Sequence, residues 1–259
     1  MRRQVVVTEF LKLRRSAVPW VSLAAILCGP AAMALFMWII RDPARAASLG
    51  LLGTKANLTG LEATWTAYGS YLAVIVGASG MLLLAFIVAY LFGREYADGT
   101  ARNLLALPVD RTWFALGKLA VAAAWWLVLT LIAILEGFLI GWALGLPGYT
   151  TGLGLKVVTN TLVAAAASLL LVPVIAWITV WTRSYLAALG FALGMLLLGD
   201  VVGHTGWAAW FPWSIVPMMT GMSGPVSAVV PWSSYLVLGL TFFGGTVAVM
   251  LQLRYADNP

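Results

Sequence analysis

Charged side chains are scarce in this sequence. They account for 9% of its 259 residues, whereas hydrophobic side chains account for 62%. Soluble domains carry about 25% charged residues, so the composition excludes a soluble globular domain. The sequence predicts a membrane protein that crosses the bilayer several times.

Cysteine is almost absent too, because Cys28 is the only one. A single cysteine excludes an internal disulfide and suggests no metal-binding cluster. Since Cys28 lies in an apolar run, we expect it to be a small buried hydrophobic residue. The net charge of +6 does not call for a nucleic-acid partner, because a basic excess in a membrane protein usually reports orientation and contact with anionic headgroups.

Six apolar runs are long enough to cross the ~30 Å hydrocarbon core, which takes about 20 helical residues. Helices are expected because each backbone amide in the bilayer must find its partner within the same segment. The predicted fold class is therefore an all-α polytopic membrane protein with one domain, 1–259. The expected spans lie near residues 18–40, 68–92, 113–143, 157–181, 185–203 and 233–253.

The basic residues divide unequally between the two sides of this topology. Of the 15 Lys and Arg residues, eleven fall in the N-terminal segment, in the loops after the second and fourth spans, and at the C-terminus. The other four fall on the opposite side. The positive-inside rule then predicts that both termini lie in the cytoplasm.

Residues 3–15 precede the first span and favour a separate interfacial helix. Val6, Phe10, Leu13 and Ala17 fall on one face at helical spacing. Glu9, Lys12 and the arginines are expected to face elsewhere. The alternative is a flexible basic tail.

Residues 204–232, between the fifth and sixth spans, form a different kind of segment. The stretch has no formally charged side chain but is rich in tryptophan, proline and glycine. Proline and glycine break it too often for one spanning helix, and it is too apolar for a solvated loop. We expect a re-entrant or interfacial pair of short helices with the tryptophans at headgroup level; the alternative is an ordinary aromatic belt.

The loop "FGREYADGTARNLLALPVDR", residues 92–111, gathers charge between the second and third spans. Asp98-Gly99-Thr100 is typical of a turn, and Asp98 or Thr100 can cap a short helix that runs through Leu107. Pro108 stops this helix. A solvated connector would not need its leucines, so a lateral helix that presents Leu and Arg would suit docking to another protein.

This loop resembles that of the permease subunits of type-2 ABC exporters, of the drug or peptide-antibiotic export or immunity type. The shared pattern is F-x-x-E-x-x-x-G-T-x-x-x-L-L-x-x-P-x-x-R with a lysine seven residues further on. It is carried here by Phe92, Glu95, Gly99, Thr100, Leu104, Leu105, Pro108, Arg111 and Lys118.

The resemblance implies that the loop is a cytoplasmic coupling helix that rests on a separate nucleotide-binding subunit. The residues expected to carry the coupling are Glu95, Asp98, Gly99, Thr100, Arg102, Leu104, Leu105, Pro108 and Arg111. It also implies a bacterial or archaeal cell-membrane location, a second permease copy or related permease, and a drug, peptide antibiotic or lipid as substrate.

The sequence contains no G-x-x-x-x-G-K-[ST]. "ALGKLA" at 115–120 has Gly-Lys but neither the following Ser or Thr nor the glycine spacing. The chain therefore lacks the phosphate cradle of this class of ATPase, and we expect no enzyme activity and no cofactor in it. ATP and magnesium would bind in the partner subunit.

Three polar residues fall within or at the ends of spans. Glu136 lies inside the third run, where a carboxylate costs several kcal/mol unless it is protonated, paired or wet. It can line a translocation path, make a structural hydrogen bond or reach an outer vestibule. Asp200 and His204 are four apart, so they can pair on one helical face as a capping pair or form a substrate or proton site.

Two other function classes are open. "GASG" at 77–80 resembles the Gly-x-Ser-Gly of rhomboid intramembrane proteases, with Ser79 as nucleophile and His204 as base. However, small residues in a transmembrane helix are usually a close-packing surface. A stand-alone secondary transporter often shows repeated halves and several intramembrane ionisable groups. The sequence shows no convincing repeat, and only Glu136 clearly qualifies.

Overall fold

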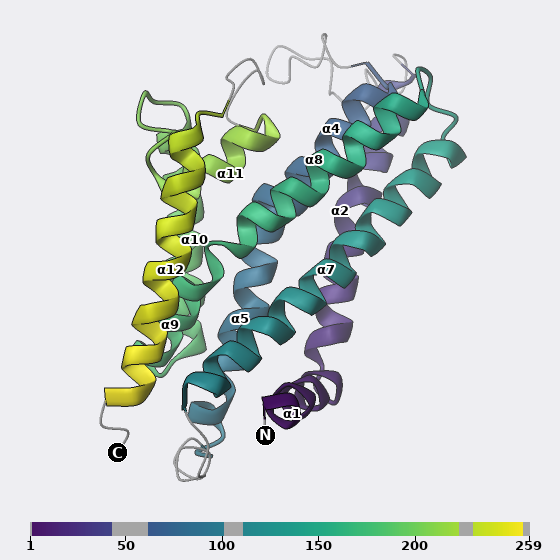
Figure 1. Cartoon of the computed structure of the whole chain (residues 1–259). Coiled ribbons are helices and arrows are strands. Elements are labelled where there is room, and N and C mark those ends of the chain that lie inside the picture. The colour runs from purple at the N-terminus through teal and green to yellow at the C-terminus, as the bar shows by residue number, and fades with distance from the viewer. Residues whose placement is uncertain (1, 43–61, 101–110, 223–229, 256–259) are drawn as a thin grey trace.

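The computed structural model describes residues 2–42, 62–100, 111–222 and 230–255 (Figure 1). Within these ranges it contains helices and no strand, and six helical segments are long and apolar enough to cross a membrane. The expected all-α fold with six spans is therefore confirmed. The helices are α1 (Arg2–Arg14), α2 (Val18–Ile40), α4 (Trp65–Val74), α5 (Gly80–Ala97), α7 (Arg111–Ala143), α8 (Thr151–Leu169), α9 (Val172–Thr182), α10 (Tyr185–Gly203), α11 (Pro212–Thr220) and α12 (Trp232–Tyr255), with a π-helical turn η1 (Ile75–Ser79) between α4 and α5.

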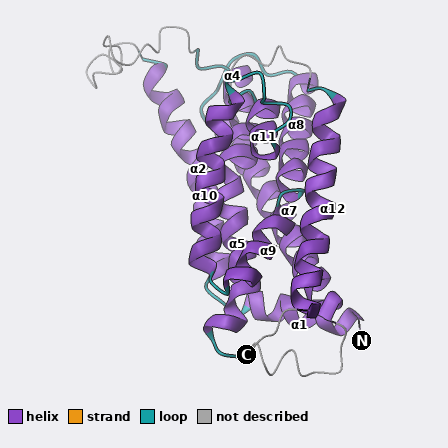
Figure 2. Ribbon diagram, turned by 90° about the vertical axis from the view of Figure 1, so that its left-hand side faces the viewer, coloured by secondary structure: helices purple, strands orange, loops and turns teal. Residues whose placement is uncertain are grey.

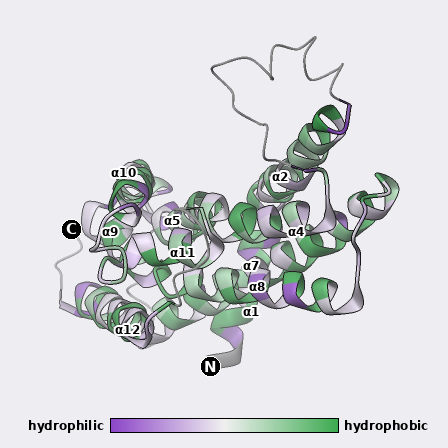
Figure 3. Ribbon diagram, turned by 90° about the horizontal axis from the view of Figure 1, so that it is seen from above, coloured by the Kyte–Doolittle hydropathy of each residue, from purple (hydrophilic) through white to green (hydrophobic). Residues whose placement is uncertain are grey.

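The second and fourth spans form the buried centre of the bundle, and the first, fifth and sixth lie on its outside. Seen from above, α9, α10 and α12 gather on one side and α2 and α4 on the other (Figure 3). Both ends of the described chain lie at the same end of the bundle, together with α1 and the start of α7 (Figures 1 and 2). This end is called the terminal end below.

Both central spans are irregular at the same level. The second span widens into η1, and the fourth, expected as one helix, is interrupted at Leu170–Leu171. Pro173 follows in the first turn of α9, where it cannot donate a helical hydrogen bond to residue 169. Ser168 Oγ lies 3.0 Å from Gly77 O, so the two irregular turns are tied together across the helix contact.

The small residues of 77–80 serve as the expected packing surface. A Cβ atom on Gly77 would lie 2.7 Å from the Ala164 Cβ atom and 2.9 Å from the Thr220 Cγ2 atom. Ser79, by contrast, is exposed on the outside of the bundle. The glycine at 77 is therefore required by the close approach of α8 and α11 to η1.

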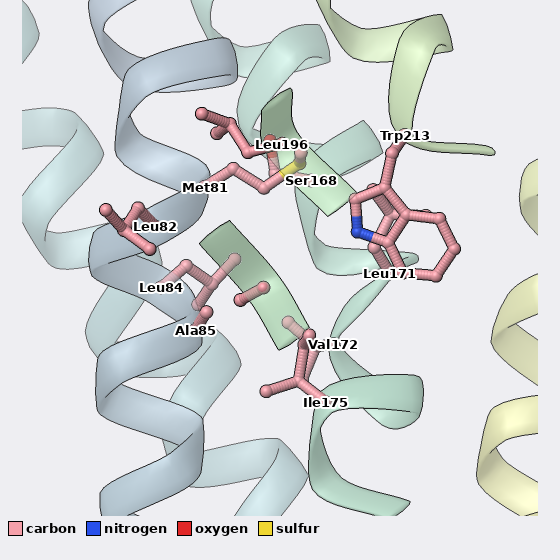
Figure 4. Close-up of a pocket in the computed structure, with 11 residues that line it drawn as sticks. Met81, Leu82, Leu84, Ala85, Ser168, Leu171, Val172, Ile175, Leu196 and Trp213 are labelled. Atoms are coloured by element: carbon pink, nitrogen blue, oxygen red, sulfur yellow. The ribbon is translucent and has the colours of Figure 1, made fainter. Parts of the chain in front are cut away.

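A small void lies beside this contact (Figure 4). It lies between Met81 of α5, Ile175 of α9, Leu196 of α10 and Trp213 of α11. Its volume is about 10 Å³, which is barely enough for one water molecule. This void is therefore too small for any larger solute.

Helix α1 lies across the terminal end of the bundle (Figure 1). The expected orientation of its faces was wrong. Glu9 is buried against the bundle together with Leu13, whereas Val6 and Phe10 are exposed. Glu9 turns inward because two lysine side chains meet it there, as described below. Cys28, expected to be buried, is also exposed, on α2.

The segment after α10 turns back on the bundle. Residues 204–211 form turns, and α11 follows as a nine-residue helix that packs against α10 and α8. The main chains of α10 and α11 come so close that a Cβ atom on Gly199 would lie 2.6 Å from Trp213 O. The pair of short helices expected within 204–232 is seen in part, since residues 223–229 lie outside the described residues. Membrane re-entry of this segment stays a prediction.

The packing at Gly77 predicts that two glycine-to-alanine changes differ in their effect on stability. We expect Gly77→Ala to lower the free energy of unfolding by about 1–3 kcal/mol, the range for an overpacked core. Gly244→Ala is the matched control, since a Cβ atom there meets nothing within 4 Å, and it should not destabilise the protein. Thermal unfolding of the detergent-solubilised protein, followed by tryptophan fluorescence, measures both. Equal midpoints would contradict the packing role of Gly77.

Candidate functional site

Four charged side chains from three helices meet inside the terminal end of the bundle. Glu9 and Lys12 come from α1, Glu95 from the last turn of α5, and Lys118 from the third turn of α7. We call these four residues the ion-pair cluster. The side chains of Glu9, Glu95 and Lys118 are 2%, 9% and 5% exposed, so the cluster is shielded from solvent.

The ammonium group of Lys118 is the centre of the ion-pair cluster. Lys118 Nζ donates to Glu9 Oε2 at 2.9 Å, to Glu95 at 2.7 Å (Oε1) and 2.8 Å (Oε2), and to Leu91 O at 2.5 Å. A lysine has three protons to donate, so every one of them has an acceptor in this arrangement. Two charges of each sign also leave the cluster neutral in sum, which is the condition for burying it.

Lys12 closes the cluster on the solvent side. Its Nζ atom lies 2.6 Å from Glu9 Oε1 and 3.1 Å from Glu95 Oε1. Burial alone raises the pKa of Glu9, but attraction to Lys118 and hydrogen bonds from Lys12 and Lys118 outweigh it and hold that pKa below its ordinary value. Burial lowers the pKa of Lys12, but hydrogen bonding to Glu9 and attraction to Glu95 raise it above the ordinary value overall. Both groups are thus charged at neutral pH.

Local sequence explains how the three helices reach the cluster. Glu9 and Lys12 are three apart and so share a face of α1, and Leu91 and Glu95 are four apart and share a face of α5. Gly117, next to Lys118, lets α1 approach α7 closely, since a Cβ atom there would lie 3.0 Å from Val5 Cγ1. Glu95 is one of the predicted coupling residues, and its carboxylate is buried. Its part in coupling stays a prediction.

Helix α5 ends directly after the cluster in a Schellman motif. Gly99 N donates to Tyr96 O at 3.3 Å and Thr100 N to Glu95 O at 2.9 Å. Gly99 has φ +66°, the left-handed conformation that glycine adopts without penalty. Asp98, Gly99 and Thr100 are exposed. The turn therefore leads the chain away from the buried carboxylate to the surface in three residues.

Arg111 begins α7 on the other side of the same loop. Its Nη1 atom donates to Leu253 O at 3.0 Å, where the last turn of α12 leaves carbonyl groups without helical partners. Arg111 therefore ties the loop exit to the sixth span. Four of the predicted coupling residues lie outside the described residues: Arg102, Leu104, Leu105 and Pro108.

The remaining predicted site residues lie outside the cluster. Glu136 is in the part of α7 remote from the terminal end, and its Oε2 atom is buried without a hydrogen-bond partner. His204 Nδ1 lies 2.8 Å from the main-chain oxygen of Asp200, so it is the main chain of Asp200 that makes this contact. The structure does not bring Asp200 and His204 to the ion-pair cluster.

A groove runs between α5 and α10 toward the terminal end. Phe86 and Tyr90 of α5 and Leu189 of α10 form its apolar part. Arg94 and Asp98, whose side chains form a 3.2 Å ion pair, lie at its end. Its volume is about 420 Å³, within the range of small-molecule sites.

The region that contains the ion-pair cluster and the groove between α5 and α10 is similar in sequence to known proteins. The sequence model of the ABC-2 family transporter proteins matches residues 5–199, from α1 to α10. The chain belongs to the ABC-2 transporter family. It is 29% identical over 188 residues to the bacitracin transport permease protein BCRB of Bacillus licheniformis, an alignment that covers 72% of this chain and 88% of that protein.

Family membership settles the broad class. This ABC-2 family protein is a multi-pass transmembrane subunit of an ABC transporter, and an ABC ATPase partner goes with such a subunit in general. The intramembrane protease and the stand-alone secondary transporter are set aside on the same ground. Sequence reasoning missed the roles of Glu9, Lys12 and Lys118; the available signal was a lysine inside an apolar run, which needs acidic partners.

Breaking the cluster at its centre should destabilise this ABC-2 protein strongly. Lys118→Met leaves two buried carboxylates without their main partner, which typically costs about 3–5 kcal/mol. Arg94→Gln, which removes the more exposed pair with Asp98, is the control and should cost less than about 1 kcal/mol. The free energy of unfolding in detergent, from denaturant titration, compares them. A Lys118→Met protein as stable as Arg94→Gln would contradict a structural role for the cluster.

The cluster also predicts how the docking of α1 depends on pH. Because the pKa of Glu9 is lowered in the folded protein, its contribution is complete above the ordinary glutamate pKa of about 4.3 and is lost as the pH falls below it. Because the pKa of Lys12 is raised, its contribution is complete below about 10.4 and is lost above that pH.

Hydrogen exchange of the α1 amides, corrected for intrinsic exchange rates, measures this dependence. Protection should hold between the two limits and fall at acid pH, with α9 as the internal reference. Glu9→Gln should flatten the acid transition. An unchanged transition in that variant would show that Glu9 does not control docking.

Proposed function

We propose that this chain is the membrane subunit of an ATP-driven exporter and that a separate ABC ATPase acts on it through residues 94–111. The single observation that carries the proposal is the ion-pair cluster directly behind this loop. It joins α1, α5 and α7 through two buried hydrogen bonds and one partly buried hydrogen bond, so a push on the loop moves three helices together. The ATPase would bind ATP and magnesium, and the present chain neither.

The loop has the mechanical features that such a role needs. It leaves α5 at the Schellman turn around Gly99 and enters α7 at Arg111, which is itself bonded to α12. A load on the loop would therefore reach the second, third and sixth spans. We place the terminal end, with both termini and this loop, in the cytoplasm of a bacterial or archaeal cell, in line with the basic excess on that side.

The groove between α5 and α10 is our candidate for half of the translocation pathway. It is apolar along most of its length and ends at the Arg94–Asp98 pair, a combination that suits an amphipathic or hydrophobic substrate. Exposed apolar side chains continue along α10, among them Leu193, Leu197 and Val201. A second permease copy, or a related permease, facing this surface would close the groove.

The proposed substrate class is a peptide antibiotic or a similar amphipathic drug or lipid. Support comes from the groove chemistry and from the similarity to a bacitracin transport permease. Bacitracin is therefore a suitable first probe. Glu136 stays a candidate pathway residue, because its buried carboxylate oxygen lacks a partner.

Co-purification and transport test the proposal together. Tagged protein in mild detergent should bring down an ABC ATPase, and membrane vesicles containing both should move bacitracin only with ATP. Gly99→Val forces a branched residue into the left-handed conformation at a strain of about 1–2 kcal/mol, so we expect transport to fall about five- to thirtyfold. Gly99→Asn tolerates this conformation better and should retain most activity.

Ser79→Ala is a second control, since Ser79 is exposed on the outside of the bundle, and it should leave transport unchanged. Two results would overturn the proposal: no ATPase subunit in the purified complex, or equal transport by Gly99→Val and the wild-type protein.

A further inference from the structure

A second groove opens on the outside of the bundle at the elbow between α1 and α2. Phe10 and Leu13 of α1, Trp20 and Leu23 of α2, and Trp125 of α7 line it, and its volume is about 310 Å³. Neither the ion-pair cluster nor the groove between α5 and α10 involves this surface. We propose that this elbow groove binds one acyl chain of an anionic phospholipid, whose phosphate is held by Arg14.

The chemistry of the lining selects hydrocarbon. Trp125 offers a ring N–H, but this group already donates to Ser22 Oγ at 3.0 Å. Among the described residues that line the groove, Arg14 carries the charge and none is acidic. A polar solute would thus find few hydrogen-bond partners inside, whereas a methylene chain would cover apolar surface.

The position of the groove places it next to lipid acyl chains. Helix α2 is the first span and begins only a few residues after α1 ends, so the elbow lies where the chain enters the bilayer. Trp20 is 73% and Phe10 47% exposed at the groove, as expected for aromatic side chains at headgroup level. Lipid is therefore the neighbour of this surface in a membrane.

The charge of the elbow favours an anionic headgroup. Arg14 and Arg15 are exposed at the end of α1, whereas the acidic residue of this helix, Glu9, is buried and held by two lysines. The elbow thus presents uncompensated positive charge beside an apolar groove, which complements an anionic headgroup with its acyl chain.

Native mass spectrometry of the full-length protein tests the proposal with two probes, dioleoyl phosphatidylglycerol and dioleoyl phosphatidylcholine. The wild-type protein should bind the first phosphatidylglycerol molecule more tightly. Arg14→Gln should weaken that step about fivefold, the contribution of one basic side chain at an anionic surface. It should weaken phosphatidylcholine binding less, because the choline ammonium group offsets the charge of the phosphate. Arg15→Gln removes the same charge next to the groove lining and is the matched control, with less than about a twofold effect expected.

Leu23→Trp fills the groove and should weaken both lipids at least about tenfold, because two buried methylenes alone supply that factor. The unfolding temperature and oligomeric mass of Leu23→Trp are measured alongside. If this variant does not fold, Arg14→Gln and Arg15→Gln still test whether Arg14 binds the headgroup. Equal effects of Arg14→Gln and Arg15→Gln on phosphatidylglycerol binding would show that the lipid responds to surface charge in general and that Arg14 forms no specific site. Unchanged lipid binding, or a changed oligomeric mass, in folded Leu23→Trp would assign the groove to something other than lipid. Any of these results overturns the proposal.

Discussion

The buried ammonium group of Lys118 is the constraint around which one end of this protein is organised. A lysine this close to the start of a membrane-spanning helix must either reach water or be met by acceptors. Here two carboxylates and a main-chain oxygen meet it. One of these carboxylates belongs to α1, so the helix that lies outside the bundle is held there by electrostatics rather than by an apolar face alone.

The cluster lies next to the turn that ends α5 at Gly99 and Thr100. Glu95 takes part in both the cluster and the turn. Its carboxylate accepts hydrogen bonds from Lys118, and its main-chain oxygen accepts the hydrogen bond that closes the turn at Gly99 and Thr100. A change in the turn and a change in the cluster are therefore mechanically linked. A loop anchored only by apolar contacts could slide without such a defined response.

The middle of the bundle has the opposite character. At the level of η1 and the interruption at Leu170–Leu171, the contacts are close and apolar, and Ser168 and Gly77 provide the polar link. Turns of this kind are less regular than an α-helix and are often found at functional positions. The described bundle is thus firmly tied at the terminal end and contains its irregular turns halfway along the two most buried spans.

The sequence by itself determined the class of protein, the six spans and the terminating turn at Gly99. These depend on length, hydropathy and glycine conformation, which are local properties. Only the tertiary structure decided that Glu9 faces inward, that the carboxylate of Glu95 is buried, and that the fourth span is broken. Hydropathy does not register a π-helical turn or a kink, because neither changes the apolar composition of a span. Nor can spacing within one helix reveal a carboxylate's partner when that partner is Lys118, 109 positions from Glu9.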